Sequence, residues 1–206
     1  MPQDVEVTGR GRSEPRRPAT GRQERGDRTR EFLIDETVRC IREEGFSAAS
    51  ARHIIDRAGV SWGVIQHHFG SRDGLLTAVI EDAIDRLVVA LEALSAPESR
   101  LETPELVRQT WEAFANPKAM AGLEILIATK ELRHSLDQGH IERLGTSLAG
   151  LMERISDGTN GDHAAALGML LWTTPVAMMI AEMFATTPLA VGEAQEAVAN
   201  LIDDHR

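Results

Sequence analysis

Apolar residues recur along most of the chain at the three- and four-residue spacing of amphipathic α-helices. Capping residues divide this pattern into segments: Ser50, Ser61 and Ser71 each precede an apolar run, and Gly45 is a typical helix stop. The sequence contains no convincing alternation of apolar and polar positions of the kind that predicts a β-strand. The pattern therefore predicts an all-α fold of about nine helices, over residues 27–45, 50–58, 61–68, 71–94, 103–115, 116–134, 138–156, 162–185 and 192–203.

The predicted helices fall into two groups. The three within residues 27–70 are short, whereas the six within residues 71–206 are mostly longer and more apolar. We therefore predict a small N-terminal three-helix domain, joined through helix 71–94 to a larger six-helix C-terminal domain. Residues 1–26 are rich in Gly, Pro, Arg and Ser and hold almost no large apolar residue, so we expect a disordered, Arg-rich tail.

One uncharged stretch, residues 164–181, reaches the length of a membrane span. Acidic residues flank it, no Lys or Arg anchor lies nearby, and Pro175 interrupts it, so we expect a bent helix buried in a soluble protein. The twin arginines Arg16 and Arg17 are not followed by the apolar segment of a signal peptide. These features predict a cytoplasmic protein that does not bind a membrane.

The net charge of −10 is distributed unevenly. Residues 1–72 contain 13 arginines and 11 acidic residues, whereas residues 73–206 contain 9 basic and 21 acidic residues. A basic-leaning head on an acidic body limits any polyanion partner to the head. The single cysteine, Cys40, excludes an internal disulfide, and on the sequence alone we expect no cysteine-based zinc site, no other metal and no cofactor.

The stretch "RAGVSWGVIQHHFGSRDGLL", residues 57–76, carries the most informative motif. Gly59 stands at a sharp turn between two short helices, Ala58 is small enough for close crossing, and Val60 and Ile65 can anchor the second helix. This is the pattern of a helix-turn-helix, whose second helix enters the major groove of DNA. Adjacent histidines point to different sides of a helix, and the glycine spacing matches neither a P-loop nor a dinucleotide fingerprint, so metal and phosphate sites are weaker interpretations.

The longer stretch "AGVSWGVIQHHFGSRDGLLTAV" closely resembles the DNA-binding signature of the TetR family of transcriptional regulators. The resemblance covers about residues 28–80, and beyond them it is architectural. The matching positions are Ala58, Gly59, Val60, Ser61, Gly63, His68, Phe69, Ser71, Arg72 and Leu75. The resemblance implies a sequence-specific regulator, most often a repressor, that binds a palindromic double-stranded DNA operator as a homodimer and is released by a small ligand.

Carried over position by position, the resemblance implies DNA contacts from the second and third helices. Gln66 replaces the usual tyrosine and can pair with adenine, and Arg72 replaces the usual lysine with its charge kept. Two interpretations stay open for Trp62, DNA contact or packing on the scaffold, and for His67, DNA contact or a solvated surface. The arginines of the tail are open in the same way, as DNA contacts or as a plain extension. The predicted DNA-binding residues are Arg52, Ser61, Trp62, Gly63, Gln66, His67, His68 and Arg72.

The resemblance also implies that the body dimerises and binds an apolar or amphipathic effector, with the 71–94 helix carrying the change to the head. For both sets of residues, ordinary packing within one chain is the alternative. The predicted effector-binding residues are Trp111, Phe114, Met120, Leu123, Ile127, Met152, Trp172 and Met179, because methionines and aromatic residues suit an adaptable apolar pocket. The predicted dimer interface comprises Ala164, Leu167, Gly168, Leu171, Met178, Ala194, Val198 and Leu201.

Three other functions are weaker. An enzyme needs a nucleophile, base or metal constellation, yet Cys40 has no paired histidine at an informative spacing and the other histidines are scattered, so we expect no catalysis. A helical protein-interaction module without specific DNA binding is compatible with the acidic total charge. A regulator that acts without a ligand is compatible with every feature of the sequence.

Overall fold

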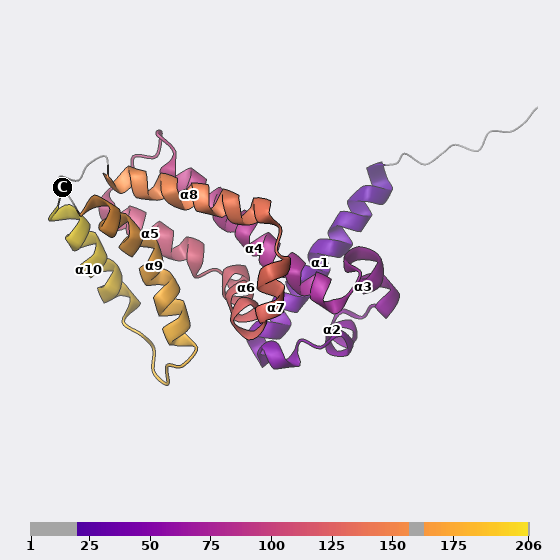
Figure 1. The fold of residues 1–206 in the computed structure, drawn as a ribbon. Helices are drawn as coiled ribbons and strands as arrows, with labels where there is room; N and C mark the ends of the chain where they lie inside the picture. Colours follow the sequence, from indigo (N-terminus) through magenta and orange to yellow (C-terminus); the bar gives the residue numbers. More distant parts are fainter. Residues whose placement is uncertain (1–19, 157–162, 206) are drawn as a thin grey trace, which may run out of the picture.

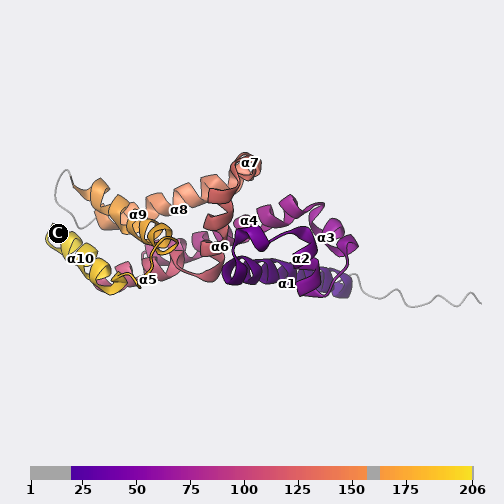
Figure 2. The same ribbon diagram turned by 90° about the horizontal axis from the view of Figure 1, so that it is seen from below.

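The computed structural model describes residues 20–156 and 163–205, and these residues contain helices but no strand. The all-α prediction is therefore confirmed. The elements are α1 (Thr20–Glu44), the 3₁₀ turn η1 (Phe46–Ala48), α2 (Ala51–Ala58), α3 (Trp62–Phe69), α4 (Arg72–Ser95), α5 (Thr103–Phe114), α6 (Pro117–Ala128), α7 (Lys130–Ser135), α8 (Gln138–Ser156), α9 (Ala164–Glu182) and α10 (Val191–Asp203). The molecule is elongated, with a head of α1–α3 at one end, a body of α5 and α8–α10 at the other, and α4 running between them (Figures 1 and 2).

Two helix boundaries differ from the prediction. The first helix begins at Thr20 rather than Asp27, and Arg25 and Arg28 donate hydrogen bonds to backbone carbonyls one turn earlier, which supports this extra length. Most of the predicted tail, residues 1–19, lies outside the described residues. The single helix expected over 116–134 is two helices, because Thr129 has an extended backbone between α6 and α7.

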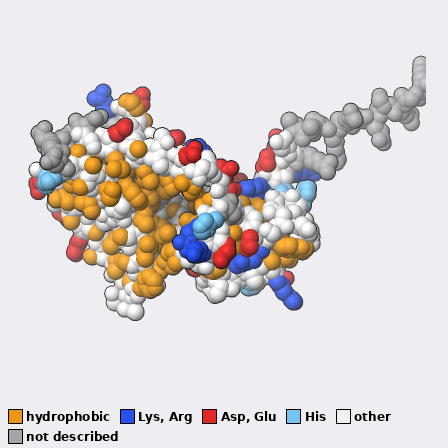
Figure 3. All heavy atoms as spheres, viewed as in Figure 1, with side chains coloured by type: hydrophobic (Ala, Val, Ile, Leu, Met, Phe, Trp, Pro, Cys, Tyr) orange, Lys and Arg blue, Asp and Glu red, His pale blue; other side chains and the backbone are white. Residues whose placement is uncertain are grey.

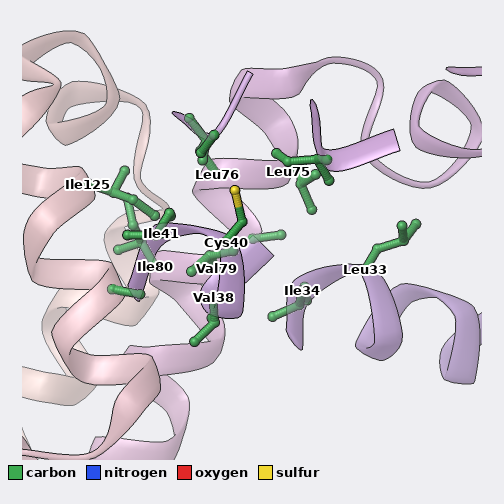
Figure 4. Packing of buried hydrophobic residues seen from close by; sticks show 14 of the residues in the cluster. Leu33, Ile34, Val38, Cys40, Ile41, Leu75, Leu76, Val79, Ile80 and Ile125 are labelled. Carbon is green, nitrogen blue, oxygen red and sulfur yellow. The ribbon is translucent and has the colours of Figure 1, made fainter. Parts of the chain in front are cut away.

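The interior consists of two apolar clusters that share α4. Buried residues recur every three or four positions along its 24 residues, from Leu75 to Leu94. The first half of α4 packs with α1–α3 and with Ala121 and Ile125 of α6 (Figure 4). The second half packs with α5, α8, α9 and α10. The apolar packing of the head therefore continues past residue 71 into α4 and α6.

Polar contacts of α6 tie the head to the body. Lys118 Nζ lies 2.7 Å from a carboxylate oxygen of Asp35 on α1 and 2.7 Å from one of Asp82 on α4. Further along α6, the Phe46 amide of η1 donates to Glu124 Oε1 at 2.7 Å. Glu124 is half-buried and holds the turn before α2.

Helix α9 is apolar on all sides, but only one side is covered within the chain. Its 18-residue apolar window is 28% buried, so the sequence expectation of a buried helix holds for one face only. Among the described helices, α9 alone is long and apolar enough to cross a membrane by length and composition, a test that core helices of soluble proteins also pass. Hydrophobic side chains gather over the body around α8 and α9 (Figure 3). Met169, Leu170 and Ile180 belong to the exposed face.

Candidate DNA-binding surface

The turn between α2 and α3 has the geometry that the sequence predicts. Ser50 caps α2, because its Oγ accepts a hydrogen bond from the His53 amide at 3.2 Å. Gly59 ends α2 with φ 64° and ψ 31°, the left-handed region that favours glycine. The chain then extends through Ser61, and α3 begins one residue later. This geometry defines a helix-turn-helix whose second helix is α3.

Helix α3 has one buried face and one exposed face. Ile65 is fully buried in the head cluster, and Val64 and Phe69 pack partly against the same cluster. The opposite face is exposed, and Trp62 on it remains 41% accessible. The exposed residues of α3 and its N-cap are the predicted DNA contacts Ser61, Trp62, Gly63, Gln66 and His67.

The start of α3 is also open toward solvent. Ser61 is exposed, and within the described part of the chain its side chain forms no capping hydrogen bond to α3. The first amides of a helix lack intrahelical partners and lie at the positive end of the helix dipole. The N-terminus of α3 therefore has the amides that a DNA phosphate requires.

Two other predicted DNA contacts, Arg52 and Arg72, differ in how far the protein restrains their side chains. Arg52 lies on α2 with a side chain that is 93% exposed, and its nearest carboxylate is Asp56 at 3.9 Å. Arg72 is half-buried: its Nε donates to the Ala49 carbonyl at 2.7 Å, and its guanidinium lies 5.3 Å from the centre of the Phe46 ring. Arg72 is thus fixed in place at the start of α4, whereas Arg52 is free to adjust.

His68 and Phe69 face the N-terminal turns of α1. The position of a Cβ on Gly26 would lie 3.9 Å from His68 Cε1, and the Arg30 guanidinium lies 5.3 Å from the centre of the Phe69 ring. His68 is accordingly half-buried. The early turns of α1, which we did not predict to be helical, support the far end of α3.

The junction between α3 and α4 is a close backbone contact. Gly70 ends α3 with a φ of 74°, and Ser71 caps α4 by accepting from the Gly74 amide at 3.0 Å. A Cβ on Gly74 would lie 2.0 Å from the Phe69 carbonyl oxygen. Only glycine fits here without a shift of the backbone, so Gly74 sets how closely α4 approaches α3.

Arg57 fixes the C-terminal end of α2. Its guanidinium binds Glu36 at 2.9 Å, Glu43 at 2.7 Å and Glu44, all on α1. The hydrogen bonds that the guanidinium donates to these carboxylates, first of all to Glu43, raise the pKa of Arg57. Arg57 therefore contributes to the orientation of α2 and does not face the surface that α3 exposes.

Comparisons with known proteins agree with this geometry. Residues 33–79 match the sequence family described as "Bacterial regulatory proteins, tetR family". HTH-type transcriptional regulators named BetI match over 98 residues, which is 40% of this chain: that of Burkholderia thailandensis is 34% identical and that of Burkholderia ambifaria 33%. The chain spans about half the length of these curated relatives, whose matches cover 50% of their sequences.

Solved structures resemble a larger part of the chain. The TetR family regulator PfmR of Thermus thermophilus is 21% identical with a TM-score of 0.62, and covers 82% of this chain and 96% of its own. A regulator assigned to the same family from Mesorhizobium loti is 18% identical with a TM-score of 0.66, and covers 87% of this chain and 96% of its own. At these identities the likeness concerns the fold. Residues 33–79 thus match the TetR family model in agreement with the sequence resemblance, and the matched relatives are named as transcriptional regulators.

An apolar cavity of about 140 Å³ lies where the body meets α4 and α6. Of the predicted effector-binding residues, Phe114, Leu123 and Met179 line it. Ile127 is 49% exposed and does not line this cavity, so its role in effector binding stays a prediction. The other four predicted residues, Trp111, Met120, Met152 and Trp172, are buried or half-buried but do not line the cavity.

The predicted dimer interface is corrected in part. Leu167, Gly168 and Leu171 are buried in the chain's own body, so they do not lie on its surface. A Cβ on Gly168 would lie 3.0 Å from Met152 Cα, so the small residue serves the close crossing of α9 with α8. Leu201 is exposed, and the other four, Ala164, Met178, Ala194 and Val198, are half-buried. The large exposed apolar residues of α9 are Met169, Leu170 and Ile180, none of which the sequence placed in the predicted interface.

Proposed function

We propose that this chain is a transcriptional regulator that binds a palindromic DNA operator as a homodimer and releases it when a small apolar ligand binds the body. The observation that carries the proposal is the exposed face of α3, which presents Trp62, Gly63, Gln66 and His67 at the second helix of a TetR-type helix-turn-helix. A helix with an anchored inner face and an open outer face is what entry into the major groove requires.

The residues of this surface divide into base and phosphate contacts. Gln66 stands one turn into α3 and can pair bidentately with adenine, while Trp62 offers an apolar edge to a thymine methyl. The amides at the start of α3 and the exposed Arg52 side chain suit phosphate. Arg72, held by Ala49, presents its remaining guanidinium nitrogens at a fixed place.

The direct test is selection of an operator from a random DNA duplex pool, followed by binding titrations at two salt concentrations. We expect a palindrome, and we expect Gln66→Ala to lose about 1–3 kcal/mol of discrimination at one base pair of each half-site. Gln138→Ala, at an exposed glutamine that begins α8, is the matched control and leaves binding unchanged. Weak binding without a shared sequence would refute the proposal and favour a protein-interaction module.

The exposed face of α9 supports the homodimer. A helix that is apolar on all sides needs a second cover, and two copies related by a two-fold axis can cover each other's α9 faces. In sedimentation measurements, Leu170→Glu is expected to shift the protein toward the monomer and to weaken operator binding. Val89→Glu is the control, because Val89 is an exposed apolar residue of α4 outside this face. Unchanged dimerisation in Leu170→Glu would refute this interface.

The cavity supports a ligand of apolar character. A void of about 140 Å³ resembles those that hold a single aromatic ring, and it is smaller than most drug-sized sites. The multidrug binding protein EbrR, whose structure contains imidazole, shares this fold at 23% identity and a TM-score of 0.50. Larger effectors would require the helices around the cavity to separate, and such a separation is the change that a ligand can stabilise.

Helix α6 supports a route from the cavity to the head. Its residues Gly122 and Leu123 line the cavity, while Lys118 and Glu124 on the same helix bind Asp35 of α1 and the Phe46 amide. A shift of α6 on ligand binding would thus act on both α1 and the turn before α2. We expect Leu123→Trp, which fills the cavity, to weaken the response to apolar ligands while the protein still binds operator.

A further inference from the structure

Three metal-ligating side chains of different chemistry meet at the back of the head. Cys40 and Glu44 lie on α1, and His53 lies on α2. One potential ligand atom from each, the thiol sulfur, a carboxylate oxygen and an imidazole nitrogen, all lie within 4.8 Å of one another. His53 Nε2 is 2.8 Å from Glu44 Oε2.

The local structure explains why these residues converge. Cys40 and Glu44 are four residues apart on α1 and therefore share one face of the helix. His53 is the third residue of α2, and its amide is fixed by the Ser50 cap. The start of α2 thus holds the imidazole over the last turns of α1.

The Cys40 thiol is aimed into this cluster from the core. Cys40 is 0% exposed and packs beside Leu76 and Val79 (Figure 4), whereas Glu44 is exposed and His53 is half-buried. Among the described residues no hydrogen bond involves the thiol, which leaves its sulfur available to a ligand at the inner end of the cluster.

Charges of both signs surround the cluster. The carboxylates Glu36, Glu43 and Glu44 face two guanidinium groups, those of Arg57 and Arg39. Burial first, and then Glu44, raise the pKa of the Cys40 thiol, while Arg57 lowers it. A metal ion that binds the sulfur would displace the thiol proton, because thiolate is the form that ligates metals.

We propose that Cys40, Glu44 and His53 form a binding site for a borderline-soft divalent metal ion such as Zn²⁺, with a water molecule as the fourth ligand. Thiolate, imidazole and carboxylate together select this class of ion, and a tetrahedral site with three protein ligands leaves one open position. On binding, the S–H bond breaks, the metal–sulfur bond forms and the proton passes to solvent. The Glu44–His53 hydrogen bond is exchanged for two metal bonds.

The site differs in place and chemistry from the apolar cavity. It joins the end of α1 to the first turn of α2, next to Arg52 in the sequence. An ion here would fix the first helix of the helix-turn-helix within the head itself. The proposal goes beyond the proposed function and does not depend on operator binding or on the cavity.

The test is titration of Co²⁺ alone into the tag-free, reduced, metal-free full chain. We expect one ion per chain, a near-ultraviolet charge-transfer band from cobalt–thiolate bonding, visible bands of tetrahedral cobalt, and loss of all of them when Zn²⁺ is added. His53→Gln and Glu44→Gln are expected to weaken binding by about tenfold or more. His134→Gln, at an exposed histidine of α7, is the matched control and leaves the titration unchanged.

Two results would overturn the proposal: no charge-transfer band at excess Co²⁺, or a band whose affinity is the same in His53→Gln and Glu44→Gln as in the unaltered chain. The second result would mean that the thiol binds cobalt without the cluster. Cys40→Ser removes the sulfur but also alters a buried position. The two surface variants leave the sulfur and the core in place, so they decide the question even where Cys40→Ser unfolds.

Discussion

Gly74 offers the sharpest test of how the head is assembled. It lies in the first turn of α4, where that helix leaves the end of α3. A Cβ at this position would lie 2.0 Å from the Phe69 carbonyl oxygen and 3.1 Å from its carbonyl carbon. Ordinary carbon–oxygen contacts begin at about 3.3 Å, so Gly74→Ala creates an overlap of more than an ångström with backbone atoms.

The expected cost follows from what must move. Side-chain overlaps in a packed interior cost about 1–3 kcal/mol, and a backbone oxygen cannot turn away as a side chain does. Replacing glycine with alanine inside a helix returns at most about 1 kcal/mol. We therefore expect Gly74→Ala to lower the free energy of unfolding by about 2 kcal/mol or more, which for a chain of this size lowers Tm by roughly 4–8 °C.

Gly145 provides the matched control. It lies within α8, is exposed, and a Cβ there would meet no atom within 4 Å. Gly145→Ala should accordingly raise the free energy of unfolding by about 0.5–1 kcal/mol. Urea and thermal unfolding measure both changes, and operator titration shows whether Gly74→Ala also displaces α3. A Gly74→Ala variant as stable as the unaltered chain would refute the close contact between α3 and α4.

Three further predictions concern other parts of the fold. Lys118→Met leaves the carboxylates of Asp35 on α1 and Asp82 on α4 without their shared partner. Urea unfolding should show a free energy of unfolding that is lower by about 1–3 kcal/mol. An unchanged midpoint would contradict a stabilising role of these two ion pairs. Hydrogen bonding by Arg108 lowers the pKa of Glu105 to about 2, so its contribution to stability is present above its unfolded pKa of about 4.3 and is lost as the pH falls toward 2. Carboxyl NMR should show the lowered pKa of Glu105, and Glu105→Gln should make the free energy of unfolding less dependent on pH below about 4.3. A pKa of Glu105 in its usual range would contradict the hydrogen bond to Arg108. Gly168→Ala places a Cβ 3.0 Å from Met152 Cα and should destabilise the protein by about 1–3 kcal/mol at the crossing of α8 and α9. Thermal unfolding measures this change, and an unchanged Tm would contradict the close crossing.

Local signals in the sequence predicted the head well. The caps at Ser50 and Ser71, the left-handed Gly59 and the buried Ile65 are each determined by nearby residues, so α2, the turn and α3 follow from the chain itself, although the Ser61 side chain does not cap α3. The exposed face of α3 follows too, because burial of Ile65 fixes the rotation of a short helix. The approach of α4 to Phe69 could not be predicted, since Gly74 fits a loop, a helix start or a phosphate site equally well in the sequence.

The body was predicted less well because α9 gives no directional signal. A helix that is apolar all round has no polar face to orient it, so spacing alone could not tell which residues face α8 and which face outward. Small size suggested that Gly168 belonged to an interface between copies, but its close contact is with Met152 of the same chain. The same ambiguity applies to Ile127 on α6, whose apolar side chain faces solvent.

The cluster of Cys40, Glu44 and His53 shows a different limit. Spacing on α1 indicates that Cys40 and Glu44 share a face, but the eight residues between Glu44 and His53 include η1 and a cap whose path only the fold determines. If both the cavity and this cluster bind ligands, the two act on α1 from different places, through Lys118 in one case and through His53 in the other. If α1 moves as one rigid helix, binding of Zn²⁺ changes the affinity of the protein for an apolar ligand. By linkage, the apolar ligand then changes the affinity for Zn²⁺ by the same factor, so the coupling can be measured from either side.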